Sequence, residues 1–412
     1  MIPDCISQPW KAPLPAELPD WHTRQERYTR SNINRQRLAA NIAGDTWSLV
    51  PLPATGNMPV SVMHQFAGDL LCARESDRLR LARTYSIGPN VTSLAVASTA
   101  GGPPQEKFTP SRLPSPHGLM VFSDPIGHFT DTMSVSGRPI EVHTPIVAAS
   151  WSLWDESEER HPARGVEVDW VIRDGGGPSR IDPGLRGIWL TLYSPNSHDL
   201  TGVPDDAVID ISGGNATVGD MRRFDRDRNT HEKESWGPLS WHDEILLPFG
   251  GVFSPEVAPN SNAQWAAVVY STFQAMQQTH GKNKDPLTET RTAGLPPAVR
   301  KKAKKEGKLT GEGKVQVVDL AASLRPSKDA TARDAADSDG LRQVRFSHRW
   351  PVLPWRRMTC TNPYLHNKLR DDDHEHHEHR EDLMPFQVRG PAGKPLRTRP
   401  GRTFTFDVPA AE

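Results

Sequence analysis

The chain has 412 residues, 36% of them hydrophobic, and its formal net charge is −1. A total charge this close to zero excludes a uniformly basic nucleic-acid coat, so any site for a polyanion has to be a local patch. No apolar run approaches the ~18 residues that span a bilayer, and the first residues lack the pattern of a signal peptide, so we expect a cytoplasmic protein without a membrane segment.

The N-terminal part is predicted to be helical after a short extended arm. Residues 1–20 are rich in proline and should be extended. Residues 21–43 contain neither glycine nor proline and predict a helix that Gly44 ends. A second helix is expected over 59–84 from its apolar positions. We therefore assign a helical segment to 21–85.

Alternating apolar residues predict a sheet in the middle of the chain. The expected strands are 118–122, 145–154, 165–173 and 187–194. Residues 261–279 follow, with Trp265, Val268, Val269, Phe273 and Met276 at helical spacing. We predict an α+β fold in which an antiparallel sheet carries this packed long helix, within a core domain over 115–280.

A basic linker is predicted over 281–341. Its charge is concentrated in Lys301, Lys302, Lys304 and Lys305, ahead of a short strand at 315–320. Such lysines neutralise phosphates without reading sequence, although a solubilising linker would use the same residues. Residues 322–340 show no periodicity, and we expect disorder there.

The segment 342–412 is predicted to be a small β-rich module in which cations alternate with aromatic rings. The residues concerned are Arg345, Arg349, Trp350, Trp355, Arg356 and Arg357. Guanidinium groups pair with phosphates and indole rings stack on bases, so the pattern suits RNA or single-stranded DNA. The alternative is a strand whose tryptophans build a small core while the arginines stay solvated.

This module carries a resemblance to a known family. HRWPVLPWRR at 348–357, the pair His379–Arg380 and VRGPAGKPL at 388–396 resemble motifs of an uncharacterised family of proteins from actinobacterial plasmids, integrative elements and phages. The middle of the chain is similar as well, which extends the resemblance over about 115–412. Where the family has Arg-Gly-His before a tryptophan, this chain has Val352–Leu353–Pro354. The resemblance implies a genomic context and no particular chemistry.

A histidine cluster suggests a second kind of site. His374, His376, His377 and His379 lie close together among acidic residues. Imidazole and carboxylate ligands suit Zn, Ni or Cu, so a divalent metal is a possible ligand there, whereas no other cofactor is expected. The alternative is a solvated variable loop, because histidine-rich tracts also bind metals adventitiously.

Several carboxylates, histidines and thiols are further candidates for chemistry. Glu167 and Asp169 should share one face of a strand, and His242, Asp243 and Glu244 follow Trp241. Paired carboxylates can hold Mg²⁺ in nucleases, but solvated strand faces show the same pattern. Asp124, His128 and His143 could meet at a strand end, although their spacing does not require it. The cysteines Cys5, Cys72 and Cys360 are far apart, which predicts isolated thiols rather than a zinc finger or disulfides.

These patterns lead to one principal hypothesis and two alternatives. The first is a non-enzymatic nucleic-acid-associated protein of a phage or mobile genetic element, with phosphate contacts from the lysines and C-terminal arginines. The second is a metal-dependent nuclease or toxin that uses the sheet carboxylates or the histidines. The third is a protein-binding scaffold that acts on a host or phage factor.

Overall fold

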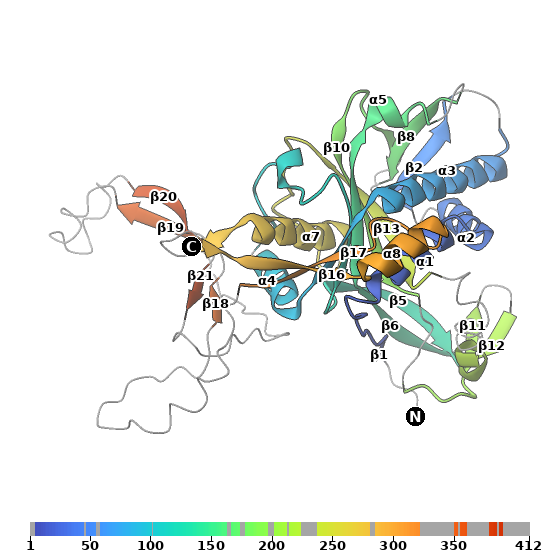
Figure 1. The fold of residues 1–412 in the computed structure, drawn as a ribbon. Coiled ribbons are helices and arrows are strands. Elements are labelled where there is room, and N and C mark those ends of the chain that lie inside the picture. The colour runs from blue at the N-terminus through green and yellow to red at the C-terminus, as the bar shows by residue number, and fades with distance from the viewer. Residues whose placement is uncertain are drawn as a thin grey trace, which may run out of the picture. The chain divides into compact units, whose positions relative to one another are not determined.

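The computed structural model is shown in Figure 1. It describes residues 5–44, 47–54, 58–100, 102–162, 166–173, 178–196, 202–211, 214–223, 237–280 and 285–321, with the strand residues 350–352, 355–360, 379–384 and 387–389. The chain divides into two compact units, one made of Met1–Thr279 and Pro286–Leu320 and the other of His280–Asp285 and Ala321–Glu412. The predicted helical segment 21–85 and core 115–280 thus contribute to one unit.

The larger unit holds most of the helices. They are α1 (Leu18–Thr29), α2 (Asn32–Ala43), α3 (Val60–Leu81), α4 (Pro89–Thr99), the 3₁₀ helix η1 (Pro110–Arg112), α5 (Glu156–Glu159), α7 (Asn262–Gln277) and α8 (Pro297–Lys305). Among the described residues, no helix is long and apolar enough to cross a bilayer.

A seven-stranded mixed sheet forms the centre of this unit, in the order β13-β10-β7-β4-β3-β17-β16. In this order its strands are Leu239–Pro248, Arg186–Pro195, Ala148–Asp155, His117–Phe122, Arg83–Ile87, Lys314–Leu320 and Thr288–Gly294. β3 runs parallel to β4 and β17, whereas the remaining neighbours are antiparallel. The predicted α+β class is confirmed, but this sheet is mixed rather than purely antiparallel.

The parallel centre of the sheet depends on α4, a helix that the sequence patterns did not predict. α4 follows β3 and carries the chain to β4, as a parallel pair requires, because a tight hairpin can only join antiparallel strands. Pro89 occupies the first turn of α4, where its fixed φ suits a helix start. Val91, Leu94 and Ala95 are buried.

Helices cover both faces of the large sheet. α3 lies on one face, where its Glu75 accepts a hydrogen bond of 2.6 Å from the Ser150 hydroxyl of β7. α7 lies on the other face, where Phe273 packs against Trp151 with 4.8 Å between ring centroids. Because Ser150 and Trp151 are consecutive strand residues, they point to opposite faces. The predicted helix over 261–279 and its packing on a sheet are confirmed.

The predicted helix over 21–43 is two helices. α1 ends at Thr29, and the hydroxyl of Ser31 then accepts a hydrogen bond of 3.2 Å from the backbone N–H of Asn34. This cap satisfies an N–H that has no partner within the new helix. α2 crosses α3 closely at Gly68, where an added Cβ would lie 3.1 Å from the carbonyl oxygen of Arg35.

Two smaller sheets flank the large one. The first has the strand order β1-β6-β5-β11-β12 and the second β2-β8-β9. Their strands are β1 (Cys5–Ser7), β2 (Leu49–Pro53), β5 (Gly127–Val135), β6 (Arg138–Ile146), β8 (Val168–Arg173), β9 (Pro178–Arg180), β11 (Val208–Ile211) and β12 (Gly214–Thr217). The five-stranded sheet has a core of its own, which includes Ile6, Val135, Ile140, Val142 and Ile209.

Much of the segment predicted as a linker completes the large sheet. β16, α8 and β17 all fall within 281–341, and β17 lies between β3 and β16. Val315, Val318 and Leu320 of β17 are buried. The short strands β14 (Thr279–His280) and β15 (Asp285–Pro286) precede β16. The disorder expected over 322–340 falls outside the described residues.

The smaller unit contains two antiparallel strand pairs within the predicted β-rich module. β18 (Trp350–Val352) pairs with β21 (Gln387–Arg389), and β19 (Trp355–Cys360) pairs with β20 (His379–Met384). In the second pair Arg357 lies opposite Asp382, and Cys360 lies opposite His379.

Candidate ligand-binding site

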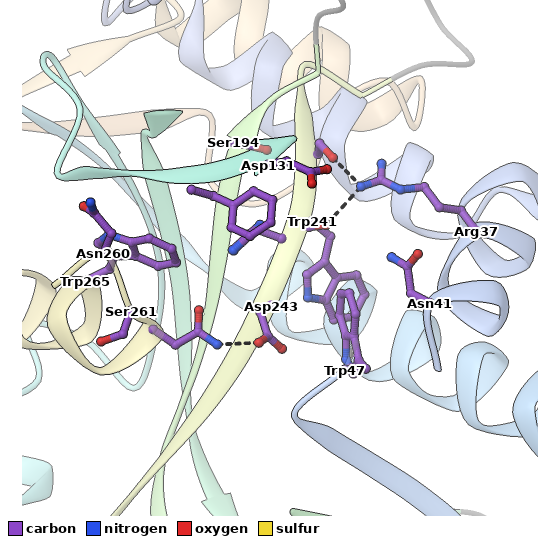
Figure 2. Close-up of a pocket in the computed structure, with 14 residues that line it drawn as sticks. Arg37, Asn41, Trp47, Asp131, Ser194, Trp241, Asp243, Asn260, Ser261 and Trp265 are labelled. Carbon is purple, nitrogen blue, oxygen red and sulfur yellow. Dashed lines mark hydrogen bonds between the residues drawn. The ribbon is translucent and has the colours of Figure 1, made fainter. Parts of the chain in front are cut away.

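A cavity of about 710 Å³ opens where β13 meets the N-terminus of α7. Figure 2 shows its walls, which come from α2, the segment before β2, β5, β10, β13 and α7. The described residues that line it include a cation, carboxylates, an imidazole and several aromatic rings. Such a mixture of apolar walls and a few polar groups is typical of small-molecule sites.

A β-bulge in β13 shapes the floor of the cavity. Leu192 of β10 pairs with Asp243 and the next residue, Tyr193, pairs with Trp241, so His242 has no partner across the ladder. Bulges of this kind redirect side chains and are frequent beside functional sites. Here the bulge allows Trp241, His242 and Asp243 all to line the same cavity.

The His242 ring is half-buried between aromatic neighbours. Its centroid lies 4.8 Å from the Phe129 ring and 5.3 Å from the Trp265 ring. Burial, together with the nearby Arg37 charge, lowers the pKa of His242 to about 4. At neutral pH the imidazole is therefore uncharged and can donate one hydrogen bond and accept another.

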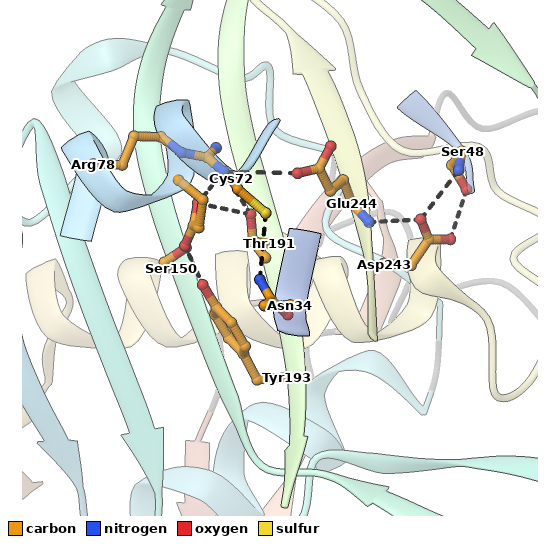
Figure 3. A network of polar contacts seen from close by, with 10 residues as sticks. Asn34, Ser48, Cys72, Arg78, Ser150, Thr191, Tyr193, Asp243 and Glu244 are labelled. Atoms are coloured by element: carbon orange, nitrogen blue, oxygen red, sulfur yellow. Dashed lines mark hydrogen bonds and ion pairs between the residues drawn. The ribbon is translucent and has the colours of Figure 1, made fainter. Parts of the chain in front are cut away.

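Asp243 is a structural anchor of the site. Its carboxylate accepts hydrogen bonds from the Ser48 hydroxyl (2.6 Å), the Ser48 N–H (3.2 Å), the Glu244 N–H (2.8 Å) and the side-chain amide of Asn262. Figure 3 shows the contacts to Ser48 and Glu244. Burial raises the pKa of Asp243, although these donors oppose that effect. Asp243 thus joins β13, the start of β2 and the first turn of α7.

Arg37 provides the positive charge of the cavity wall. Its Nη2 donates to the Ser240 hydroxyl (2.5 Å) and to the Trp241 carbonyl oxygen (3.2 Å), which joins α2 to the bulged strand. These two contacts use one nitrogen of a guanidinium that offers five N–H donors. Figure 2 shows Arg37 beside Ser194 and Asp131 at one end of the cavity.

The N-terminus of α7 provides a second positive element. The Ser261 hydroxyl caps this 16-residue helix by accepting from the Gln264 N–H at 3.3 Å. Helix N-termini carry a partial positive charge and exposed N–H groups, both of which favour anions. Asn260, Ser261 and Asn262 all line the cavity. An anion in this cavity would therefore meet favourable groups on opposite walls, from α2 and from α7.

A buried polar network connects α3 to the strands β7, β10 and β13 (Figure 3). Glu75 of α3 forms an ion pair with Arg78 and also accepts from Ser150 and from the Tyr193 hydroxyl. The Arg78 guanidinium lies 3.7 Å from the Trp189 ring centroid, and its Nη2 lies 3.7 Å from a Glu244 oxygen.

The network is enclosed and therefore structural. Glu75 and Glu244 have side-chain exposures of 0% and Arg78 of 7%, so no substrate can reach them in this conformation. Burial raises the pKa of Glu244 well above its ordinary value, although the Arg78 charge opposes the shift. Burial thus disfavours the charged form of Glu244, whereas Glu75 forms the closer ion pair with Arg78.

The predicted nucleic-acid and metal residues lie in three different settings. Lys301, Lys302, Lys304 and Lys305 share the exposed helix α8. Trp350, Trp355, Arg356, Arg357 and His379 lie in the strands β18, β19 and β20, and the surroundings of their side chains are not described. Arg345, Arg349, His374, His376 and His377 lie outside the described residues.

The paired carboxylates at β8 are engaged with arginines. Glu167 accepts from Arg160 at 2.9 Å, and Asp169 forms ion pairs with Arg180 and Arg160. Because both carboxylates have cationic partners, the geometry gives no support to a Mg²⁺ site at Glu167 and Asp169. His128 and His143 do meet, with stacked rings 4.5 Å apart.

Most of the pocket could not be recognised from the sequence. The run that ends in His242, Asp243 and Glu244 was a candidate from its carboxylates. Arg37 and Phe129, in contrast, belong to segments with no motif. Only the three-dimensional fold brings these residues to the bulge. Comparisons of the chain with protein-family models, with curated proteins and with solved structures found no match. Inferences about function therefore rest on the geometry of the site.

Proposed function

We propose that the pocket recognises a nucleotide unit, either free or at the end of a strand. The observation that carries this proposal is the pairing of an exposed aromatic ring with cationic groups in one cavity. Phe129 is 38% exposed, a large value for a ring that lines a pocket, and it rests on the neutral His242 ring. A base can stack on such a ring, while Arg37 and the start of α7 meet the phosphate.

The size of the cavity agrees with this ligand class. Small-molecule pockets typically span about 300–1,000 Å³, and this cavity of about 710 Å³ falls within that range. Asp131 at the rim and the uncharged His242 add groups that can bond to a base or sugar. We infer that the protein acts as a nucleic-acid-associated protein of a phage or mobile element.

Replacing Phe129 with alanine should weaken nucleotide binding about 5- to 150-fold, because a base–aromatic stack contributes about 1–3 kcal/mol. Replacing Arg37 with alanine should reduce the preference for a nucleoside monophosphate over its nucleoside, because only the start of α7 would still meet the phosphate. The tryptophans at the cavity, Trp47, Trp241 and Trp265, allow binding to be followed by intrinsic fluorescence.

The matched controls are Leu14→Ala and Arg80→Ala, which alter an exposed apolar and an exposed basic residue that do not line the cavity. Both should bind nucleotides as the wild type does. The proposal fails if no nucleoside monophosphate changes the fluorescence, or if the control variants lose as much affinity as Phe129→Ala and Arg37→Ala.

A second candidate function, sequence-independent binding to a nucleic-acid backbone, is favoured by α8. Lys301, Lys302, Lys304 and Lys305 are all exposed on this helix. Among the described residues of this surface, Glu306 forms ion pairs with Lys302 at 4.0 Å and with Lys308 at 3.0 Å. A cationic helix with so little acidic compensation attracts phosphates. The C-terminal arginines and tryptophans remain a predicted second contact for RNA or single-stranded DNA.

Changing the four α8 lysines to glutamine should weaken oligonucleotide binding and flatten its salt dependence. If each lysine contacts one phosphate, the slope of log K against log salt should fall in magnitude by about 3–4. Fluorescence anisotropy with single- and double-stranded oligonucleotides at several salt concentrations measures this slope. The double variant Arg80→Gln/Arg186→Gln, on other surfaces, is the control, and an equal change in both variants would contradict a role specific to α8.

A further inference from the structure

The outward face of the five-stranded sheet carries a thiol, an imidazole and a carboxylate side by side. β1 and β6 pair in parallel register, with Cys5 opposite Glu141 and Ser7 opposite His143. Glu141 and His143 are two residues apart and so share a face of β6. Ile6, Ile140 and Val142 point the other way, into the core of this sheet. The alternation of buried and polar residues therefore fixes the three groups on the solvent side.

The potential ligand atoms of these three groups lie close enough together to approach one metal ion. The Cys5 sulfur lies 3.6 Å from the His143 ring nitrogens, and His143 Nε2 lies 3.6 Å from a Glu141 oxygen. The three potential ligand atoms all lie within 4.8 Å of one another. Zinc bonds of ordinary length at tetrahedral angles would place S and N about 3.6 Å apart and N and O about 3.4 Å apart. Coordination would require the Cys5 side chain to turn toward one ring nitrogen of His143, because its sulfur lies equally far from both.

The neighbouring side chains hold the imidazole in place. The His128 ring stacks on His143, and His128 Nε2 lies 3.2 Å from the side-chain nitrogen of Asn260. An interplanar angle of 27° leaves the two rings nearly parallel, so both cannot point at one ion between Cys5 and Glu141. The fourth position would remain open to water.

We propose that Cys5, His143 and Glu141 form a binding site for Zn²⁺ or a metal of similar preference, with one coordination position open. Thiolate and imidazole ligands favour zinc over Mg²⁺ or Ca²⁺, which prefer all-oxygen sites. On binding, the Cys5 thiol releases its proton to solvent and its sulfur bonds to the metal, so metal affinity rises with pH. This site is separate from the nucleotide pocket, and its existence does not depend on that proposal.

Cobalt provides a direct test, because Co²⁺ replaces Zn²⁺ and a thiolate ligand produces a charge-transfer absorption band in the near ultraviolet. The full chain should carry His374→Gln, His376→Gln and His377→Gln, so that this tract does not compete for metal. We expect a thiolate–cobalt band that saturates at one equivalent and disappears when Zn²⁺ is added. Cys5→Ser should abolish the band.

The other cysteines provide the matched thiol controls. Cys72 is buried, with a pKa raised to about 12 by burial, and Cys360 lies in β19. The variants Cys72→Ala and Cys360→Ser should therefore keep the band. Loss of an outer-shell partner typically weakens metal binding about 10–100-fold. His143→Gln and Glu141→Gln remove direct ligands, so they should weaken cobalt binding at least as much. Far-ultraviolet circular dichroism checks that each variant is folded.

Alkylation of Cys5 supplies a second readout. Zn²⁺ should protect this thiol from iodoacetamide in the wild type, and the protection should be lost in His143→Gln. A cobalt band that persists in Cys5→Ser would overturn the proposal. So would rapid alkylation that Zn²⁺ does not slow, because this result would identify Cys5 and His143 as a metal-free thiol–imidazole pair.

Discussion

The variant Glu75→Ala is expected to lower the free energy of unfolding by about 3–5 kcal/mol, because it leaves Arg78 buried without its closest ion-pair partner. The Glu75 carboxylate also accepts hydrogen bonds from Ser150, at 2.6 Å, and from Tyr193, and both donors would lose their acceptor. Arg78→Met should have a comparable cost, since it leaves Glu75 buried without its cationic partner. Urea unfolding at pH 7 measures both effects.

Glu244→Gln is the matched control for this network. Because burial raises the pKa of Glu244 well above its ordinary value and so favours the neutral form, a neutral amide of the same shape should cost little. A buried acid with a raised pKa loses stability as pH rises above its unfolded value, here 4.5. The free energy of unfolding of Glu244→Gln should therefore rise relative to that of the wild type above that pH, by up to about 1.4 kcal/mol per pH unit.

The double variant Glu75→Ala/Arg78→Met separates pairing from packing. Removing both charges should cost less than the sum of the two single changes, because no unpaired ion remains. Additive losses would show that the ion pair itself contributes nothing. A loss of more than about 3 kcal/mol in Glu244→Gln at pH 7 would contradict the raised pKa of Glu244.

Acid is expected to destabilise the protein partly through His242. The folded-state pKa of this imidazole is about 4, against an ordinary value of 6.5, so the unfolded chain binds the proton more readily between these values. The stabilisation that comes from the neutral His242 should be fully present above pH 6.5 and should be lost as pH falls towards 4. At pH 4 the free energy of unfolding should be about 3 kcal/mol lower on account of His242.

The variant His242→Gln isolates this contribution from other buried groups. His22, for example, also has a pKa lowered by burial and remains in both proteins. Urea unfolding of both proteins from pH 4 to 7.5 should show a shallower acid limb for the variant. Parallel profiles would mean that His242 is protonated as readily in the folded state as in the unfolded chain.

The sequence predicted individual elements better than their assembly. The helix over 261–279 was evident because Trp265, Val268 and Phe273 form one apolar face and Ser261 caps it. The mixed sheet was not evident, because β17 resembles any short strand in a basic segment and its partner β3 lies far away in the chain. Local patterns report which residues prefer a strand, and they carry no information on parallel pairing between distant segments.

The candidate sites show the same limit. Arg37 is one of several arginines in a polar helix, and only its contact with the bulged strand distinguishes it. The spacing of Cys5 and His143 suggests isolated residues until β1 and β6 are placed side by side. The exposed lysines of α8 were predictable, because a run of like charges needs no tertiary partner to be recognised.

The position of β17 has a consequence for synthesis on the ribosome. Val315 pairs with Thr84, 231 residues earlier in the chain. At about 5–20 residues per second, the edge of β3 would wait roughly 10–50 s for its neighbour to be made. An unpaired strand edge invites pairing with other chains. The nascent protein should therefore need a chaperone or a temporary cover for β3, and chains that end before residue 314 should aggregate.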